Sequence, residues 1–543
     1  MHGRSDYYIV WGWLAVLILS SCQVTPNSAT PLPTAAARIQ VPTISPIPET
    51  ATTVVTVVAT ATPTRLPIPS PTAIPPDFIQ TNFNTFYVAT DGDDDRGDGS
   101  VDRPWATISR ASDEVPDDSI VLVQPGLYNG YVNLRSRFDK GILILSAVPY
   151  QARLRNEQKV INCHLCRGIT LEGFDIAHEG PGAGRYVVQI QDQEGEGDGG
   201  RHVILRNNII HDSYNNDLVK VNNGANDIII EGNIFYNQSG SDSHIDVNSA
   251  TNVTIQDNVF FNDFAGSGRP NNNDTGSFIV VKDSQEGDDR NIGAANIIIR
   301  RNILFNWEGL PTNTFIVVGE DSVDYYQAYD VLIENNLLLG NAPHLARGAF
   351  GVKGSRDIIF RHNTIVGDLP SKAFSMRLNL QENNPIILNV EFYNNIWSDP
   401  TGTMGAEGAN TSNDFSDTQP QEIKSFVLLN NLYWNGETAI PVDETDLINY
   451  TDDPAAIVAD PQLPPQDNIV LPRWDEVSGR FADDSTTIRE VFTRLVLLYG
   501  MLARNSPAID RANPDFSTTE DILGMPRPSG SRPDIGAYEF QVP

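Results

Sequence analysis

Lysine and aspartate side chains recur at one place in a series of short apolar segments. In DLVKVNN, from Asp217, the alternation of a β-strand directs Lys220 outward between two inward valines. In SHIDVNS, from Ser243, the same alternation directs His244 and Asp246 outward. Lys220 and Asp246 are therefore predicted to occupy nearly equivalent places on neighbouring strands.

Further cations extend this strip. The segments SFIVVKD, GAFGVKG and AFSMRLN place Lys282, Lys353 and Arg377 on it or just beyond it. Such a set suits β-elimination from a uronate, in which a base removes the C5 proton and a cation neutralises the carboxylate. A lysine serves as the base only where burial or neighbouring cations lower its pKa. His244 is a further candidate general acid or base, because histidine titrates near neutral pH.

The same residues also have a simpler interpretation. A lysine on an exposed strand is usually solvated, and a Lys220–Asp246 salt bridge between coils would contribute only about 0–1 kcal/mol at a surface. Hydrolysis is the competing chemistry and needs two carboxylates about 5–9.5 Å apart across a sugar. The segment NNDLVKV has a lysine where a second acid would be required, so elimination ranks above hydrolysis.

An asparagine repeat predicts the elements that carry this strip. Its pattern is three apolar-biased residues, two variable residues, an asparagine and further apolar residues, as in VILRNNII from Val203. The repeated asparagines are Asn208, Asn233, Asn258, Asn302, Asn336, Asn363, Asn395 and Asn431. The first three follow one another at intervals of 25 residues. A Val/Ile-rich repeat of this length, without helical periodicity, predicts one turn of a parallel β-helix.

We expect this asparagine ladder to be structural rather than catalytic. Asparagine tolerates the left-handed bend between two strands. Its amide can also bond to the asparagines of the coils above and below.

Two terminal segments carry a family resemblance. FYVATDGDDDRGDGSVDRPWATISRASDEVPDDSIVLVQPGLYNGYV, from Phe86, resembles the opening of extracellular right-handed β-helix proteins, including polysaccharide lyases of the pectate-lyase-like superfamily. SPAIDRANPDFSTTEDILGMPRPSGSRPDIGAYEF, from Ser506, resembles the terminal module of the same broad group. The resemblance implies an all-β fold, a right-handed parallel β-helix over residues 84–480, with an N-terminal helical cap and a C-terminal capping segment over 481–543. It is weak evidence for a reaction, because this scaffold serves lyases, hydrolases, epimerases and adhesins.

The resemblance also implies roles for single residues. The related lyases commonly pair a lysine or arginine base with Ca2+ held by acidic residues. Lys220 is then the first candidate base and Lys353 the second. The candidate Ca2+ ligands are Asp217, Asp242 and Asp246, which are hard oxygen donors on neighbouring coils. The candidate substrate-binding residues are Asn222, Asn248, Lys282 and Arg377.

Two further motifs have metal or redox alternatives. The acidic loop with Asp91, Asp93, Asp94, Asp95 and Asp98 is dense enough for Ca2+ but lacks a closing glutamate, so we expect a surface loop. Cys163 and Cys166, in NCHLCRG, lack the other ligands of a zinc site and the setting of a thioredoxin motif. We expect them to form a small disulfide or to pack as two thiols.

One stretch departs from the repeat and predicts an amphipathic helix. It is TTIREVFTRLVLLYGMLAR, from Thr486. Its apolar side would contain Ile488, Val491, Phe492, Leu495, Leu498 and Leu502. We expect it to cap the C-terminal coils, in preference to binding a partner.

The N-terminal residues predict export and lipid anchoring. Residues 1–21 are typical of a signal peptide, because Arg4 precedes an apolar run about half as long as the ~20 residues of a membrane-spanning helix. Leu19-Ser20-Ser21-Cys22 resembles the lipobox of bacterial lipoproteins, which implies a lipid-modified Cys22; cleavage beside an incidental cysteine is the alternative. Residues 22–80 are rich in proline and threonine and predict an extended stalk.

These observations leave two functions. The net charge of −32 disfavours nucleic acid as a partner. We therefore expect an exported monomer, anchored by lipid at the cell surface, with a polysaccharide as its partner. It is either a lyase that cleaves a uronate-containing glycan or a non-catalytic, glycan-binding or adhesin-like protein. Convergence of Lys220, His244, Asp246 and Lys353 on one cleft would favour the lyase.

Overall fold

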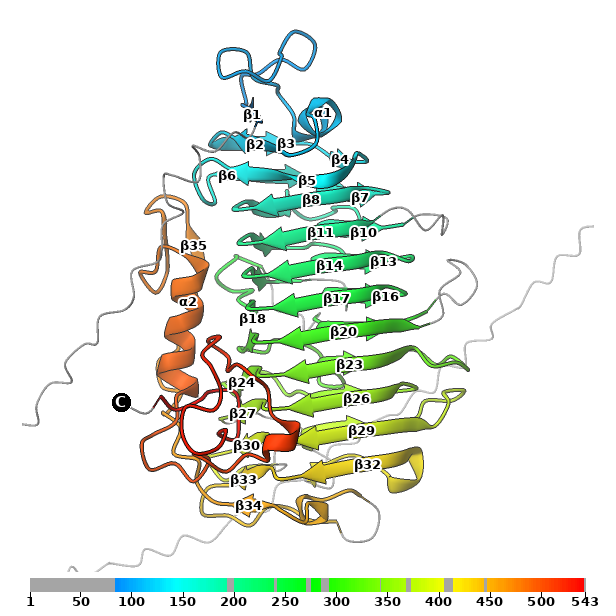
Figure 1. Cartoon of the computed structure of the whole chain (residues 1–543), viewed down its shortest axis with the longest axis vertical. Coiled ribbons are helices and arrows are strands. Elements are labelled where there is room, and N and C mark those ends of the chain that lie inside the picture. Colours follow the sequence, from blue (N-terminus) through cyan, green and yellow to red (C-terminus); the bar gives the residue numbers. More distant parts are fainter. Residues whose placement is uncertain are drawn as a thin grey trace, which may run out of the picture. The chain divides into compact units, whose positions relative to one another are not determined.

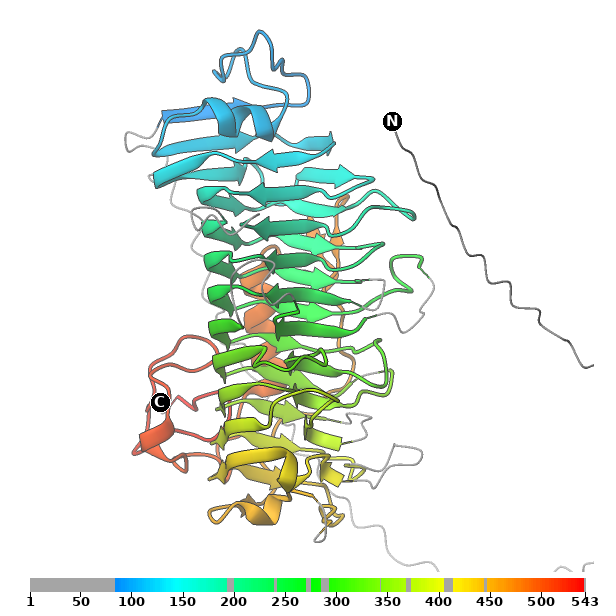
Figure 2. The ribbon, with the colours of Figure 1, turned by 90° about the vertical axis from the view of Figure 1, so that its right-hand side faces the viewer.

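The asparagine-containing repeats form the coils of a parallel β-helix. The computed structural model of the protein describes residues 84–192, 200–238, 242–269, 275–284, 293–341, 343–367, 373–404, 414–443 and 447–541. The predicted signal peptide, Cys22 and the stalk lie outside these residues. Within the described part, the predicted all-β, right-handed parallel β-helix is confirmed by three long sheets whose strands pair in parallel with those of the next coil (Figures 1 and 2).

Each complete coil contributes one strand to each sheet in a fixed order. The first sheet contains β1 (Asn84–Val88), β2 (Ser119–Val123), β5 (Arg137–Ser146), β8 (Arg167–Glu172), β11 (Arg201–Arg206), β14 (Asn226–Glu231), β17 (Thr251–Gln256), β20 (Ala294–Arg300), β23 (Ala328–Glu334), β26 (Arg356–Arg361), β29 (Ile387–Tyr393) and β32 (Ile423–Leu429). The second sheet contains the short strands that follow the asparagines: β3 (Gly126–Asn129), β6 (Ala152–Asn156), β9 (Asp175–His178), β12 (Ile209–His211), β15 (Ile234–Tyr236), β18 (Val259–Phe261), β21 (Ile303–Leu304), β24 (Leu337–Leu339), β27 (Thr364–Val366), β30 (Ile396–Ser398), β33 (Leu432–Trp434) and β34 (Ile457–Val458). The third sheet contains β4 (Val132–Leu134), β7 (Ile161–His164), β10 (Val188–Gln191), β13 (Val219–Asn222), β16 (Ser243–Asn248), β19 (Ser277–Lys282), β22 (Thr314–Val318), β25 (Gly348–Val352), β28 (Ala373–Leu378) and β31 (Asp414–Ser416). These sheets end at Val458, before the predicted boundary at residue 480.

Alternating side chains fill the interior of the coils. In β14, for example, Ile228 and Ile230 are fully buried in the core, whereas Ile229 between them faces outward and is half-buried. The same alternation in neighbouring strands stacks aliphatic residues in rows along the axis, because coils repeat at the strand spacing of about 4.8 Å. Burial of these rows stabilises the stack.

The asparagine ladder is confirmed. Asn302 donates its backbone N–H and its Nδ2 amide to Oδ1 of Asn336, each at 3.0 Å, and Nδ2 also donates to the Ile255 carbonyl at 3.0 Å. The ladder ends on a carboxylate, since Asn431 donates to Oδ2 of Asp453. The left-handed conformation, however, belongs to the residue before each ladder asparagine, as at Arg301 before Asn302. The predicted reason for asparagine at this place is therefore wrong in that part, and the amide contacts are what require it.

A short helix closes the N-terminal end. Helix α1 (Ile108–Glu114) begins at Thr107, whose side chain accepts a hydrogen bond from the Arg110 N–H. Its buried face joins the core cluster of the first coils, and it lies at the N-terminal end of the stack in Figure 1. In the preceding acidic loop, Asp94 accepts hydrogen bonds from the N–H groups of Ala106 and Thr107, and Asp98 pairs with Arg103. These two carboxylates therefore stabilise the loop through contacts with its own residues and with those just before α1.

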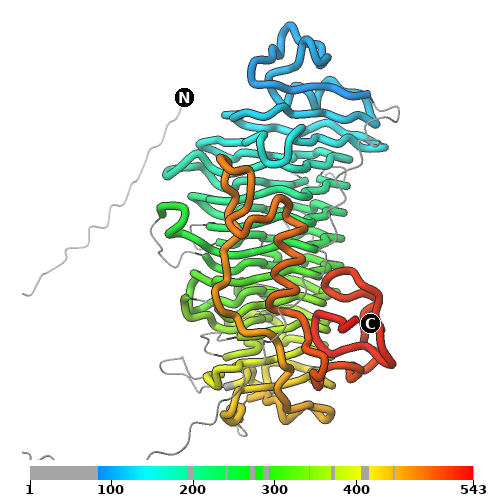
Figure 3. Tube along the Cα trace, turned by 90° about the vertical axis from the view of Figure 1, so that its left-hand side faces the viewer, coloured from blue at the N-terminus to red at the C-terminus, as the bar shows by residue number. Residues whose placement is uncertain are grey.

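The chain after β34 returns along the outside of the second sheet. This return segment (residues 459–487) contains the hairpin of β35 (Trp474–Asp475) and β36 (Arg480–Phe481), and helix α2 (Ile488–Leu495) follows it. Figures 1 and 3 show both running beside the coils. The Trp474 ring lies 4.8 Å from the Tyr150 ring, near the N-terminal coils.

The predicted amphipathic helix is present, but it covers a flank of the β-helix. Its buried residues Ile488, Val491, Phe492 and Leu495 share a core cluster with outward residues of the second sheet such as Val259. Leu498 is exposed, contrary to prediction, because helix α2 ends at Leu495 and a π turn (Val496–Gly500) changes the periodicity. Among the described residues, short 3-10 turns also occur at Pro420–Glu422, Tyr450–Asp452 and Pro514–Phe516. Across the described part of the chain, we find no helix with the length and apolarity needed to cross a membrane.

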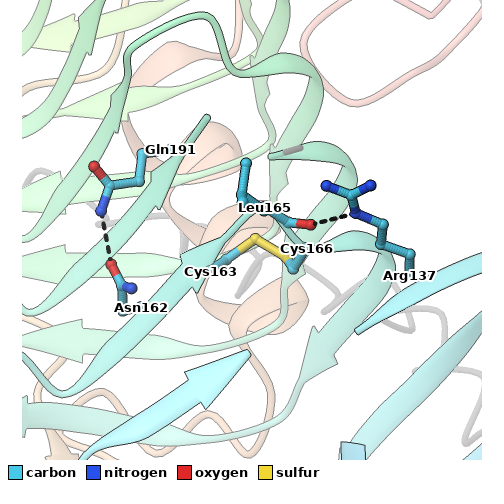
Figure 4. The surroundings of a disulfide bond; sticks show 6 residues. All are labelled: Arg137, Asn162, Cys163, Leu165, Cys166 and Gln191. Atoms are coloured by element: carbon cyan, nitrogen blue, oxygen red, sulfur yellow. Dashed lines mark hydrogen bonds between the residues drawn. A yellow bond between two sulfur atoms is a disulfide. The ribbon is translucent and has the colours of Figure 1, made fainter. Parts of the chain in front are cut away.

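The two remaining cysteines form a disulfide, which was one of the two predicted alternatives. Cys163 and Cys166 bridge the turn between β7 and β8, with their Cα atoms 5.3 Å apart (Figure 4). Both are buried in the core. Leu165, between them, has a left-handed φ of 60°, and its carbonyl accepts a hydrogen bond from Nε of Arg137 at 3.2 Å. The disulfide therefore constrains the turn between β7 and β8, near the N-terminal end of the coil stack.

Candidate active site

One outward row of the third sheet carries three of the predicted site residues, Lys220, Asp246 and Arg377. Register pairs join its members, coil by coil, in the order Lys220, Asp246, Val280, Val317, Gly351 and Arg377. Their neighbours on each strand, such as Val219 and Val221, belong to the core cluster. The predicted equivalence of Lys220 and Asp246 is therefore confirmed. We call this set the outer row.

The N-terminal part of the outer row is a buried ion pair. The Nζ atom of Lys220 lies 2.5 Å from Oδ2 of Asp246 and 3.9 Å from Oδ2 of Asp217. Burial opposes the charge on Lys220, but these two carboxylates raise its pKa above the ordinary value. A lysine held as an ammonium is a poor base. The salt-bridge interpretation of this pair is thus confirmed, and the geometry does not suit Lys220 for the role of first candidate base.

Lys282 continues the ion network into the next coils. Its Nζ atom lies 2.5 Å from Oε2 of Glu320, 3.4 Å from Oδ2 of Asp321 and 4.0 Å from Oδ2 of Asp246. Burial lowers its pKa, but the surrounding carboxylates raise the pKa by more than burial lowers it. Lys282 is therefore also held as an ammonium, with its charge directed to protein carboxylates.

The predicted Ca2+ ligands do not fit a divalent cation. Oδ2 of Asp246 accepts a hydrogen bond from the Lys220 ammonium, and Oδ1 of Asp217 accepts one from the Ser243 N–H at 2.8 Å. Asp242 accepts a hydrogen bond from the Asn216 amide. Burial, together with the Asp246 carboxylate, raises the pKa of Asp217 well above its ordinary value. Within the described ranges, no group of three or more His, Cys, Asp or Glu side chains is arranged to hold a metal ion.

The predicted outward orientation of His244 is wrong. Its ring lies 4.9 Å from the Phe278 ring, its Nε2 atom lies 3.1 Å from Oδ1 of Asn262, and it is fully buried. Burial lowers its pKa to about 3, so the ring stays neutral. The register places His244 level with Phe278 at the start of the strand, where side chains turn into the core before regular alternation begins.

Two predicted substrate-binding asparagines form part of a protein amide network. Oδ1 of Asn222 accepts from Nε2 of Gln189 at 2.9 Å, and Nδ2 of Asn222 donates to Asn223 at 2.8 Å. Nδ2 of Asn248 donates to Oγ of Ser284 at 2.6 Å. Both asparagines are buried. Their amides thus tie neighbouring coils and loops together.

A pocket opens further along the same face, around Gly351. Glycine leaves a hollow here, because a Cβ atom at this position would lie only 2.8 Å from Oγ1 of Thr314 and 3.2 Å from Cγ2 of Val317. The free volume is about 40 Å3, which suits water or a small functional group. The residues that line it are Ser277, Thr312, Asn313, Thr314, Val317, Glu320, Arg347, Gly351, Lys353, Arg377 and Asn379. We call it the cationic pocket, after Arg347, Lys353 and Arg377.

Lys353 differs from the other two lysines of this face. Its Nζ atom donates to the Glu320 carbonyl and to Oε1 of Gln381, each at 3.3 Å. None of the described carboxylates forms an ion pair with it. Burial lowers the pKa of Lys353, the nearby Arg377 lowers it further, and Glu320 opposes the shift. These are the conditions under which a lysine can act as a base.

Two guanidinium groups complete the pocket. Burial and the charge of Arg377 lower the pKa of Arg347 to about 10, which still leaves it charged at neutral pH. Nε of Arg377 lies 3.3 Å from Oδ2 of Asp417, and Arg347 pairs with the same carboxylate. Two cations therefore share one anion beside Lys353. Paired guanidinium groups are suited to bind a planar carboxylate.

The sequence strip thus separates into two regions. The predicted convergence of Lys220, His244, Asp246 and Lys353 on one cleft is not found. Lys353 and Arg377 line the cationic pocket, whereas Lys220 and Asp246 form a closed ion pair and His244 lies in the core. Sequence reasoning missed Arg347, which immediately precedes the segment GAFGVKG. It also missed Glu320, just after β22, and Asp417, directly after β31.

The chain is similar to several solved structures, at 12–14% sequence identity in the three described next. The structure is similar to the crystal structure of pectate lyase Pel9A, with a TM-score of 0.47 and 14% sequence identity, over 84% of this chain and 97% of that chain. It is similar to XylC in complex with xylose, with a TM-score of 0.43, 12% identity and coverage of 84% and 99%. A GH136 lacto-N-biosidase from Eubacterium ramulus has a TM-score of 0.46, 12% identity and coverage of 69% and 68%. No protein-family model and no curated protein sequence matches the chain.

Proposed function

We propose that the protein is a carbohydrate-active β-helix protein that cleaves a uronate-containing glycan by β-elimination at the cationic pocket. The observation that carries this proposal is the placement of Lys353, whose pKa is lowered, beside Arg347 and Arg377 in one hollow. The small volume suits the carboxylate of a uronate, while the sugar ring lies outside, against the outer row. The base is therefore Lys353, the second of the two predicted candidates.

Each group has one task in this reaction. The guanidinium groups of Arg347 and Arg377 pair with the uronate carboxylate and stabilise the charge that develops when the C5 proton leaves. The neutral amine of Lys353 takes that proton. The C5–H electron pair forms the C4–C5 double bond as the C4–O bond breaks, and water protonates the departing oxygen. Lys353 then returns its proton to solvent.

The test uses the purified full chain and a panel of uronate-containing polysaccharides. Formation of the C4–C5 double bond is followed by ultraviolet absorbance, and Lys353→Ala is compared with Lys424→Ala, which alters an exposed lysine on β32. We expect product with the wild type and the control, and a loss of about 10²–10⁴-fold with Lys353→Ala. Binding of a glycan without any product would overturn the lyase and favour the non-catalytic, glycan-binding alternative.

We also propose that the protein is held at the cell surface by lipid on Cys22. The lipobox-like sequence before Cys22 and the proline-rich stalk after it support this proposal. The stalk would hold the β-helix away from the membrane, where polymeric substrates are accessible.

A further inference from the structure

Three lysines on the third sheet or just beyond it have different electrostatic partners. Lys220 and Lys282 each contact a carboxylate oxygen at 2.5 Å. Lys353 contacts a backbone carbonyl and an amide oxygen instead. Yet a carboxylate is close by, because Glu320 lines the same pocket as Lys353. The structure must therefore keep this carboxylate away from Lys353.

Glu320 is held by both its side chain and its backbone. Its Oε2 atom lies 2.5 Å from Nζ of Lys282, and its N–H donates to Oε1 of Gln327 at 3.0 Å. The backbone carbonyl oxygen of Glu320 accepts a hydrogen bond from Nζ of Lys353 at 3.3 Å. The carboxylate thus points to Lys282 while the carbonyl points to Lys353. Lys282 itself is kept in place by Asp321 and Asp246.

We propose that Lys282 is a positioning residue that sequesters the Glu320 carboxylate and so leaves the Lys353 amine without an ion-pair partner. This inference rests on the proposed role of Lys353 as the base. An ion pair with Glu320 would hold Lys353 as an ammonium and prevent it from taking a proton. The ion network that begins at Lys220 therefore acts through Lys282 on the neighbouring pocket.

The charged groups that face Lys353 come from several elements. Glu320 and Asp321 follow β22 and favour the ammonium form, whereas Lys282 on β19 and Arg377 on β28 disfavour it. Arg347, before β25, lines the pocket and adds a further positive charge. Removal of the Lys282 charge therefore acts in one direction: it releases Glu320 and removes a repelling cation, and both changes favour protonated Lys353.

The first test measures Lys353 directly and needs no substrate. Acetylation of Lys353 by acetic anhydride is followed by mass spectrometry as a function of pH in the full chain. In Lys282→Gln we expect the midpoint to rise by about one pH unit or more. In Lys282→Arg, which keeps the ion pair, we expect the wild-type midpoint. In Lys282→Gln/Glu320→Gln, which has no carboxylate to release, we expect most of the shift to disappear.

An unchanged midpoint in Lys282→Gln would overturn the inference, and so would a shift that the double variant retains. Thermal unfolding checks that each variant is folded. Should Lys282→Gln not fold, Lys282→Met removes the charge and keeps the methylene chain over the sheet.

The second test uses the lyase reaction. The ascending limb of the pH–rate profile should move to higher pH in Lys282→Gln and return in the double variant. Absence of any product with the wild type contradicts the proposed function alone, because the acetylation result still decides whether Lys282 controls Lys353. Wild-type activity with an unshifted profile in Lys282→Gln contradicts the role of Lys282 alone.

Discussion

The Nζ atom of Lys220 lies 2.5 Å from Oδ2 of Asp246 on the next coil, and both side chains are buried. The pair stands on the same outward row as Arg377, yet its two charges are satisfied by each other. A row of charged residues on a β-helix can therefore combine a structural ion pair and a reactive pocket a few coils apart. Whether a charged residue of this row is paired or lies in the pocket depends on the side chains that the neighbouring loops place beside it.

Removal of one partner from this pair should destabilise the protein. We expect Lys220→Met and Asp246→Leu each to lower the free energy of unfolding by about 3 kcal/mol, because each leaves a buried charge without its partner. The double variant should cost less than the sum of the two, since it removes both charges. Denaturant unfolding measures the three values. Single-variant losses below about 1 kcal/mol would mean that the pair behaves like an exposed one.

Removal of divalent cations should leave the protein unchanged. Asp217, Asp242 and Asp246 already contact protein donors, so a chelator such as EDTA has no ion to withdraw from them. We expect the same Tm and the same lyase rate with and without EDTA. A drop in either quantity that added Ca2+ reverses would contradict this account of the three carboxylates.

Truncation of one ladder asparagine should be costly. Asn302→Ala removes the acceptor of the Asn258 N–H and Nδ2 groups and the donor to the Ile255 carbonyl, all of them buried. We expect a loss of about 4 kcal/mol in the free energy of unfolding, because several polar groups lose their partners. Asn383→Ala, at an exposed position, should change stability by less than about 0.5 kcal/mol.

The stability of the protein should depend on pH through His211. Its Nε2 atom lies 2.8 Å from Asp175 and its Nδ1 atom 2.7 Å from Asp212. Burial lowers the pKa of His211, but the two carboxylates raise it by more, so the net shift is upward. This stabilisation is therefore complete below the unfolded pKa of about 6.5 and is lost as pH rises through the folded pKa. Tm of the wild type should fall over this range more steeply than Tm of His211→Gln, and parallel curves would contradict the prediction.

The proposed lipid anchor at Cys22 predicts that membrane association depends on this residue. When the gene is expressed in a bacterium that processes lipoproteins, the wild type should sediment with membranes and incorporate labelled palmitate. Cys22→Ala should do neither, because the lipid replaces a spanning helix. Membrane association of Cys22→Ala equal to that of the wild type would contradict the anchor.

The fold was predictable because it depends on a periodic pattern. The eight asparagines predicted the coils, and strand alternation predicted the register of Lys220 with Asp246. The partners of the outward residues were not predictable in the same way. Glu320 and Asp417 follow strands of the third sheet, but which cations they pair with depends on the fold of the loops, and the orientation of His244 depends on where regular strand alternation begins. Leu498 was misplaced because a change from α-helix to π turn has no signal in apolar periodicity.

The return segment has a consequence for how the protein unfolds. In a simple repeat array each unit contacts only its neighbours, so terminal units can open independently. Here Arg153 pairs with Glu476, 323 residues later in the chain, and Oγ of Ser267 accepts a hydrogen bond from Arg473. The opening of early coils must therefore disrupt a segment that follows the last coil. Fraying from either end is coupled to distant coils, which favours a single cooperative transition over stepwise loss of repeats.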